Sequence, residues 1–227
     1  MREIVLDTET TGLDPASGHR LVEIGCVELV NHIRTGNYYH TYLNPERDMP
    51  REAENVHGLS AAFLVDKPLF KHVAAGMLEF IADSTLIIHN AAFDMKFLNA
   101  ELDKVGLPLI PFERAFDTVL MARQKFPGQP ASLDALCKRF SIDLSARTKH
   151  GALLDAELLA DVYLELRGGR QSTLGLVAAA NETVVEASLH FSGHTSIPER
   201  HFPPSSEELA AHRHMLEKIK LALWLTQ

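Results

Sequence analysis

Two carboxylates lie close together near the start of the chain, in the segment Val5-Leu6-Asp7-Thr8-Glu9-Thr10-Thr11-Gly12. Asp7 and Glu9 are two positions apart, and on an extended backbone such residues project to the same side. Two anions held side by side repel each other unless a cation neutralises them, so the pair could bind a metal ion. The alternative is a solvated strand-to-turn junction, since Asp, Thr and Gly all favour turns. Further ligands elsewhere in the chain would decide between these two interpretations.

More candidate ligands follow at two places. Asp94 comes after the apolar run Leu86-Ile87-Ile88, near the start of a predicted helix, where open α/β sheets place ligand sites. On its own, Asp94 could also be a first-turn acid that the helix dipole favours. His150 precedes another predicted helix, and we expect Asp155 in the second turn of that helix. Asp155 interrupts a run of leucines and alanines, and a charge at the edge of an apolar face needs a partner or a metal ion.

A layered α/β domain must position these residues. The apolar runs predict strands over 4–6, 21–30, 38–43, 86–88 and part of 114–119. Short turns, one of them at Thr35-Gly36-Asn37, make the first three strands an antiparallel meander. Helical spacing predicts helices that begin near Pro68 and Asn90, and Asn90 is a candidate N-cap for the helix that follows it. Further helices are predicted over 119–126, 132–140 and 152–167. The strand–helix alternation then completes one domain, which ends near residue 167.

The composition limits the classes of protein that fit. The chain has 227 residues with an ordinary apolar content, enough for a sizeable core. A net charge of −8 argues against a protein that holds nucleic acid mainly by bulk positive charge. Cys26 and Cys137 lie in apolar surroundings, which suggests no disulfide framework and a reducing compartment. No signal peptide or membrane-spanning run is evident, so we expect a soluble cytoplasmic protein with no membrane partner.

Three motifs taken in order carry a resemblance to a known family. They are Asp7-Thr8-Glu9-Thr10-Thr11-Gly12, His89-Asn90-Ala91-Ala92-Phe93-Asp94, and His150 followed by Asp155 after four residues. The chain resembles the histidine-containing DEDD (DEDDh, DnaQ-like) 3′→5′ exonucleases. The resemblance implies an RNase H-like fold, with a mixed five-stranded sheet flanked by helices. It also implies hydrolysis of a terminal phosphodiester with release of nucleoside 5′-monophosphates.

The family resemblance further implies roles for individual residues. Two Mg²⁺ or Mn²⁺ ions, which prefer oxygen ligands, would be bound. Asp7, Glu9 and Asp155 would hold one ion, Asp7 would bridge to the second, and Asp94 would reach it through water. His150 would be the general base, a usual task for imidazole near neutral pH. The implied substrate contacts are Thr10, Gly12, Leu13, Glu52, His57, Asn90 and Phe93, although Leu13, His57 and Phe93 could equally be packing residues.

Nearly the whole chain resembles one subgroup of this family, the proofreading epsilon subunits of bacterial DNA polymerase III. That subgroup implies the DNA 3′ end, the polymerase III alpha subunit and the sliding clamp as partners, in the cytoplasmic replisome. The segment Gln171-Ser172-Thr173-Leu174-Gly175-Leu176 resembles a clamp-binding peptide, although six residues specify little. The segment 206–212 resembles the part that docks on the polymerase. The expected partner contacts are Gln171, Leu174, Leu176, Leu209, Leu216 and Trp224.

The predicted organisation is therefore an exonuclease domain over 1–169, a flexible tether over 170–204 and a polymerase-binding helix within 205–227. Ser205 and Glu208 form a capping-box pattern at the start of that helix. An isolated helix of this length is marginal in water, so its apolar stripe needs a partner or packs back on the domain. Two rival functions stay open: an RNA-trimming exonuclease of the same superfamily, and a non-catalytic scaffold between clamp and polymerase.

Overall fold

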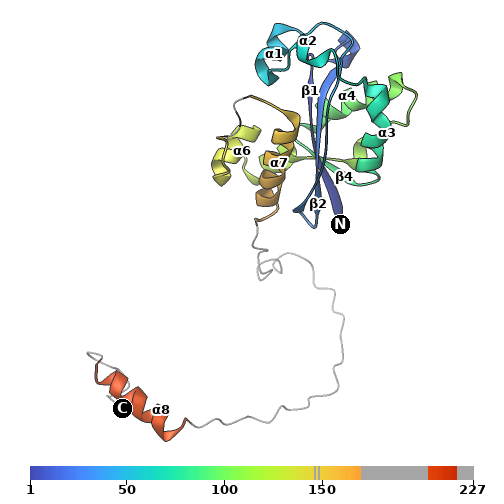
Figure 1. Ribbon diagram of the computed structural model, residues 1–227. Helices are drawn as coiled ribbons and strands as arrows, with labels where there is room; N and C mark the ends of the chain where they lie inside the picture. The colour runs from blue at the N-terminus through green and yellow to red at the C-terminus, as the bar shows by residue number, and fades with distance from the viewer. Residues whose placement is uncertain (146, 148, 170–203, 219–227) are drawn as a thin grey trace, which may run out of the picture. The chain divides into compact units, whose positions relative to one another are not determined.

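The computed structural model of the protein describes residues 1–145, 147, 149–169 and 204–218 (Figure 1). The chain divides into two units, residues 1–176 and 177–227, and each is described by itself. Among the described residues, no helix is long and apolar enough to cross a membrane.

The first unit is built on a mixed five-stranded sheet with the strand order β3-β2-β1-β4-β5. Its strands are β1 (Arg2–Thr10), β2 (Leu21–Val30), β3 (Ile33–Tyr42), β4 (Thr85–Ile88) and β5 (Ala115–Asp117). The first three strands form the predicted antiparallel meander, whereas β4 runs parallel to both β1 and β5. A parallel neighbour requires a long crossover, which the helices between β3 and β4 supply. The expected mixed sheet is confirmed.

Helices cover both faces of this sheet (Figure 1). The crossover contains α1 (Arg51–His57), α2 (Ala61–Leu64) and α3 (Phe70–Ile81), and the later helices are α4 (Ala91–Lys104), α5 (Thr118–Lys125), α6 (Leu133–Phe140) and α7 (Ala152–Leu166). Side chains of β1 alternate between two cores. Ile4 and Leu6 belong to the core with α3 and α4, whereas Val5 belongs to the core with α7. This alternation decides which face each acidic residue of β1 occupies.

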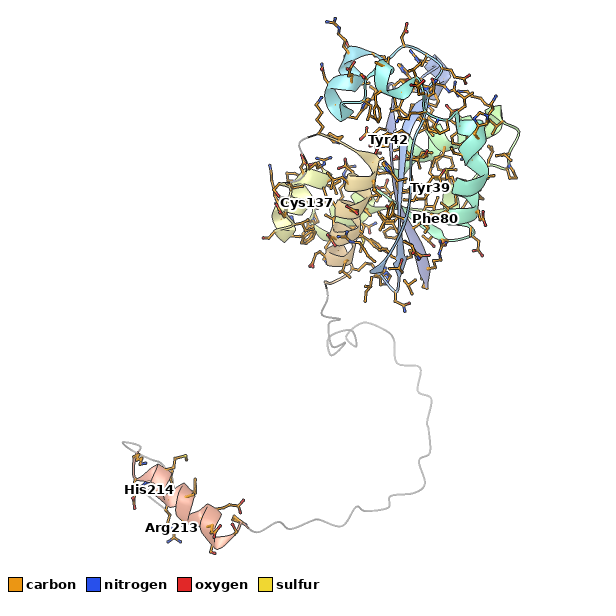
Figure 2. The ribbon with its side chains drawn as sticks, viewed as in Figure 1. Tyr39, Tyr42, Phe80, Cys137, Arg213 and His214 are labelled. Carbon is orange, nitrogen blue, oxygen red and sulfur yellow. The ribbon has the colours of Figure 1, made fainter. Side chains whose placement is uncertain are left out.

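Aromatic contacts attach the crossover to the outer strand. The Tyr39 ring of β3 lies 6.0 Å from the Phe80 ring of α3, and its hydroxyl donates to the Val73 carbonyl at 3.2 Å (Figure 2). At the end of the same strand, Tyr42 meets Phe63 edge-to-face at 5.0 Å. On the other side of the sheet, Cys137 is buried among α5, α6 and α7. The first two aromatic contacts attach α3 and α2 to β3.

The predicted turn at Thr35-Gly36-Asn37 is wrong. The hairpin turns at Asn31 and His32, whose φ angles are 52° and 66°. A two-residue hairpin turn with positive φ at both positions matches the strand twist, and Asn adopts it readily. Residues 35–37 instead lie within β3 opposite Glu28, where the register shifts, and Thr35 and Asn37 both donate to the Glu28 carboxylate.

Two smaller predictions about the positions of residues in helices also differ from the structure. α3 begins at Phe70, after Leu69 at the N-cap, so Pro68 is not its first helical residue. Helix α7 begins at Ala152 as predicted, and Asp155, its fourth residue, therefore lies in the first turn and not in the second. Apolar spacing indicates which face of a helix is buried but not the residue at which the helix begins.

The second unit contains α8 (Ser206–Leu216). The Ser205 side chain accepts from the Glu208 amide, and the Glu208 carboxylate accepts from the Ser205 amide, which confirms the predicted capping box. Leu209 is exposed, and Leu216 is buried. The expected tether, the clamp peptide with Gln171, Leu174 and Leu176, and Trp224 lie outside the described residues.

Candidate active site

Three elements bring four carboxylates together at one edge of the sheet. Asp7 and Glu9 lie on β1, on the face that packs against α7. Asp155 is in the first turn of α7, and Asp94 is in the first turn of α4, directly after β4. Because β1 and β4 are parallel, their carboxyl ends meet at this edge, where α/β sheets bind ligands. The structure thus assembles the acidic residues that the sequence motifs singled out.

Gly25 of β2 allows α7 to approach the strand that carries Asp7. It pairs directly with Asp7 in the register of β1 and β2. A Cβ atom at Gly25 would lie 2.4 Å from the carbonyl carbon of Ala152 and 2.4 Å from the amide nitrogen of Leu153. Only a residue without a side chain permits this contact. Gly25 belongs to none of the sequence motifs, although a glycine inside a strand is the usual signal of close backbone approach.

Asp94 is held from the opposite face of β1. Thr8, which points away from Asp7 and Glu9, donates its hydroxyl to Asp94 Oδ1 at 2.7 Å, and both residues are buried. This bond ties the first turn of α4 to the strand. Thr8 is a second residue that supports the candidate site and to which the motifs assigned no role. The alternation of β1 was the signal that could have found it.

The start of α4 is capped by Asp117, not by the side chain of Asn90. Asn90 occupies the N-cap position with φ 70° but makes no side-chain cap bond. The Asp117 carboxylate accepts from the amides of Asn90 at 3.3 Å and Ala91 at 3.1 Å, and also from the Val119 amide at 2.8 Å. One carboxylate at the end of β5 therefore satisfies donors of two helices, α4 and α5.

The cluster is electrostatically unfavourable without a cation. Burial, followed by repulsion from Asp155, raises the pKa of Glu9 to about 8. Burial also raises the pKa of Asp94 to about 7, and burial with the charges of Asp94 and Glu9 raises that of Asp7 well above its usual range. Among the described residues, no Lys or Arg pairs with these three groups. A hard divalent ion such as Mg²⁺ or Mn²⁺, which prefers oxygen ligands, would neutralise these buried carboxylates.

Asp155 differs from the other three acids because it has a basic partner. Arg147 donates from Nε to Asp155 Oδ1 at 2.5 Å and from an Nη atom to Oδ2 at 2.6 Å. These hydrogen bonds are the first cause of the raised pKa of Arg147. His150 Nδ1 lies 3.1 Å from Asp155 Oδ2 and 2.8 Å from the same guanidinium. No sequence motif described above includes Arg147.

His150 lies beside two of the four carboxylates. Ligand atoms of Glu9, His150 and Asp155 all lie within 4.8 Å of one another. The His150 side chain is 48% exposed, so it can exchange protons with solvent. Its amide donates to the Val56 carbonyl at 3.2 Å, which attaches the residue to α1. The side chain is thus placed between solvent and two of the carboxylates.

A cleft of about 540 Å³ begins at Glu9 and continues over the loop after β1. Its lining includes six of the seven expected substrate contacts, namely Thr10, Gly12, Leu13, Glu52, His57 and Phe93, whereas Asn90 is not among them. Leu13 is 82% exposed, so it is not a packing residue of the domain core. His57 is buried and accepts from the Leu59 amide through Nδ1 at 3.0 Å, which assigns its proton to Nε2.

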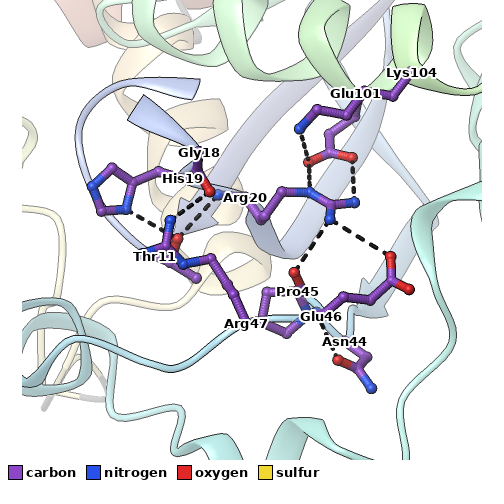
Figure 3. A network of polar contacts seen from close by, with 10 residues as sticks. All are labelled: Thr11, Gly18, His19, Arg20, Asn44, Pro45, Glu46, Arg47, Glu101 and Lys104. Carbon is purple, nitrogen blue, oxygen red and sulfur yellow. Dashed lines mark hydrogen bonds and ion pairs between the residues drawn. The ribbon is translucent and has the colours of Figure 1, made fainter. Parts of the chain in front are cut away.

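A polar network supports the loop that presents Leu13 (Figure 3). Arg20, at the end of this loop, donates to both oxygens of the buried Glu101 carboxylate of α4, at 2.5 and 2.9 Å. Its amide donates to Thr11 Oγ1 at 3.0 Å, and Arg47 donates to the Gly18 carbonyl. The loop is thereby held by fixed partners on both sides. The exposed Leu13 at the tip of this loop lines the cleft.

Comparisons with known proteins agree with this arrangement. A family model described as an exonuclease, RNase_T, matches residues 4–163. The chain is 53% identical to the DNA polymerase III subunit epsilon of Rickettsia felis over 222 residues, covering 96% of this chain and 97% of that protein. It is 42% identical to the same subunit of Escherichia coli K12, covering 96% and 93%. A solved structure of exonuclease X with 5′ overhanging duplex DNA is 26% identical, covers 73% of this chain and 90% of that one, and has a TM-score of 0.57.

Proposed function

Since the chain belongs to the exonuclease family whose model matches residues 4–163, we propose that its four-carboxylate cluster is where it cleaves DNA. The epsilon-subunit relatives make the protein a 3′→5′ proofreading exonuclease that depends on divalent metal. The proposal adds the residues that carry the reaction, the number of ions and the partners.

The observation that carries the assignment is that, in the part of the chain that the structure describes, no Lys or Arg forms an ion pair with the buried Asp7, Glu9 or Asp94. Buried carboxylates with raised pKa values are stable as anions only beside a cation. Asp7, Glu9 and Asp155 would hold one divalent ion, with Asp7 shared by a second ion that Asp94 serves through water. Two ions bound there would supply positive charge for the scissile phosphate and for the attacking and leaving oxygens.

The remaining roles belong to side chains around the cluster. His150 takes the proton from the attacking water, because it lies beside Glu9 and Asp155 and is open to solvent. The cleft beside Glu9 receives the terminal nucleotide, with Leu13 against the base and His57 Nε2 as a donor toward the sugar–phosphate. Thr8 and Gly25 act indirectly, since they fix Asp94 and α7 relative to β1.

We further propose that the protein works in the cytoplasmic bacterial replisome with the alpha subunit of DNA polymerase III and the sliding clamp. The chain aligns with more than nine tenths of the length of these two relatives, which are named DNA polymerase III subunit epsilon. In the second unit, Leu209 on α8 would contact the polymerase. The expected clamp peptide, 171–176, would supply the second contact.

The experiment that tests this function compares substrates and metals with the purified chain. We expect a 3′-mismatched DNA primer to be shortened in the presence of Mg²⁺ or Mn²⁺, with release of nucleoside 5′-monophosphates, and not in EDTA. Asp7→Ala should remove this activity. Short RNA should be degraded more slowly than the primer. Faster degradation of RNA would support the RNA-trimming rival, and activity that survives EDTA would exclude the two-metal reaction.

A further inference from the structure

Arg147 occupies both oxygens of a carboxylate that the proposed function assigns to a metal ion. Its Nε and one Nη atom donate to the two Asp155 oxygens in the parallel, two-pronged geometry that a guanidinium forms with a carboxylate. Both side chains are more than nine-tenths buried, at 8% and 4% exposure. This ion pair is therefore part of the site and not a solvated surface contact.

The same guanidinium also contacts the proposed general base. One Nη atom lies 2.8 Å from His150 Nδ1. Nδ1 also lies 3.1 Å from Asp155 Oδ2, so it accepts from the guanidinium when the imidazole proton is on Nε2 and donates to the carboxylate when the proton is on Nδ1. In this state a ligand carboxylate and His150 share one cationic partner.

A divalent ion and this guanidinium would compete for Asp155. Each carboxylate oxygen that receives a charge-assisted hydrogen bond from arginine is a poorer ligand for a cation on the same side. Two positive groups beside one buried carboxylate would also repel each other. Binding of an ion by Asp155 therefore favours the departure of Arg147.

The structure provides a place for Arg147 after it leaves. Its other Nη atom already pairs with Asp134 on α6, a carboxylate that is 52% exposed. In the described part of this loop, the Arg147 amide donates to the Leu144 carbonyl at 2.9 Å and the His150 amide donates to the Val56 carbonyl at 3.2 Å. A rotation of the Arg147 side chain toward Asp134 thus requires no movement of α7.

We propose that Arg147 is a metal-responsive latch: it neutralises Asp155 and holds His150 in the metal-free protein, and it moves to Asp134 when a divalent ion binds. The inference rests on the proposed function, because that function makes Asp155 a ligand. Arg147 is a positioning residue in this scheme, not a catalytic one. Its removal is expected to tighten metal binding.

Metal binding in the absence of DNA tests the latch separately from the nuclease reaction. We expect Arg147→Gln to bind Mn²⁺ about tenfold more tightly than the wild-type protein by calorimetry, since a pair of charge-assisted bonds no longer competes. Arg147→Lys keeps the charge without the two-pronged contact and should fall between the two. Lys149→Gln is the matched control, because Lys149 lies in the same loop but packs against Gly58. Its affinity should stay within twofold of wild type.

A second measurement follows metal binding in the unaltered protein, and a variant is needed only to assign one resonance. The Arg147 Nε–H resonance, assigned by its loss in Arg147→Lys, should be protected from exchange without metal and should move to the position of exposed arginines on titration with Mg²⁺. An unchanged resonance at saturating Mg²⁺, or weaker Mn²⁺ binding by Arg147→Gln, would overturn the latch. If Mg²⁺ displaces Arg147 from Asp155 but the protein does not cleave the primer, the latch is supported and the proposed function is contradicted.

Discussion

Replacing Gly25 by alanine should separate α7 from the strand that carries Asp7. A methyl group at this position would lie 2.4 Å from backbone atoms of Ala152 and Leu153, whereas ordinary contacts begin at 3.4 Å. The backbone of α7 must therefore move by about 1 Å, the difference between these two distances. Asp155 is three residues farther along the same helix, so its carboxylate would move away from Asp7 and Glu9.

Both stability and rate should respond to Gly25→Ala. Forcing an extra methyl group into a packed contact costs about 1–3 kcal/mol. A displacement of about 1 Å in a catalytic group lowers the rate by about 100-fold. Single-turnover cleavage of a 3′-mismatched primer, measured well below the midpoint of thermal unfolding and at saturating Mg²⁺, would give the rate, and thermal unfolding would give the stability.

Gly76→Ala is the matched control for this substitution. Gly76 lies inside α3, and a Cβ atom there would meet the Tyr39 ring at 3.9 Å, which is an ordinary contact. Alanine in a helix interior should raise stability by up to about 1 kcal/mol and leave the rate unchanged. If Gly25→Ala retained its rate within about threefold and its stability within about 0.5 kcal/mol, close packing of α7 would not be what positions Asp155.

Three further predictions concern the charge of the cluster, the helix caps and the domain boundary. Glu9 and Asp94 have pKa values in the folded protein, about 8 and about 7, above their ordinary values of 4.5 and 3.8. The folded state therefore holds more protons than the unfolded state between these limits, so the free energy of unfolding in EDTA should fall by on the order of a few kcal/mol as pH rises from 5 to 8. Addition of Mg²⁺ at pH 8 should restore the stability. A thermal-unfolding midpoint in EDTA that does not change with pH would contradict this expectation. Asp117→Ala removes caps from both α4 and α5 and should cost about 2–4 kcal/mol in urea unfolding, at least twice the loss expected for a single cap. A chain that ends at Gly169 should remain a folded, active nuclease and lose binding to the polymerase alpha subunit in gel filtration; equal binding would show that residues after 169 are not the contact.

The local sequence determined the parts of the fold that depend on short-range patterns. Apolar runs and helical spacing predicted all five strands and most of the helices, because burial periodicity is a property of neighbouring residues. The hairpin turn was misplaced at Thr35-Gly36-Asn37, since turn-forming residues also suit a bulge. Asn90 was expected to cap α4, but the cap comes from Asp117 on a strand 27 residues away. A contact over that separation has no local signature.

The sequence by itself also determined the chemistry of the candidate site. The motifs supply two acids on one strand, a third acid after β4, a histidine just before α7 and an aspartate within that helix. These side chains are hard oxygen ligands and a proton acceptor, whatever their positions in space. Tertiary structure alone decided how these groups relate. Gly25 admits α7 next to Asp7, Thr8 holds Asp94 from the opposite face, and Arg147 takes both oxygens of Asp155. The physical reason is that residue type fixes which bonds a side chain can make, whereas the packing of distant segments fixes which partners are within reach.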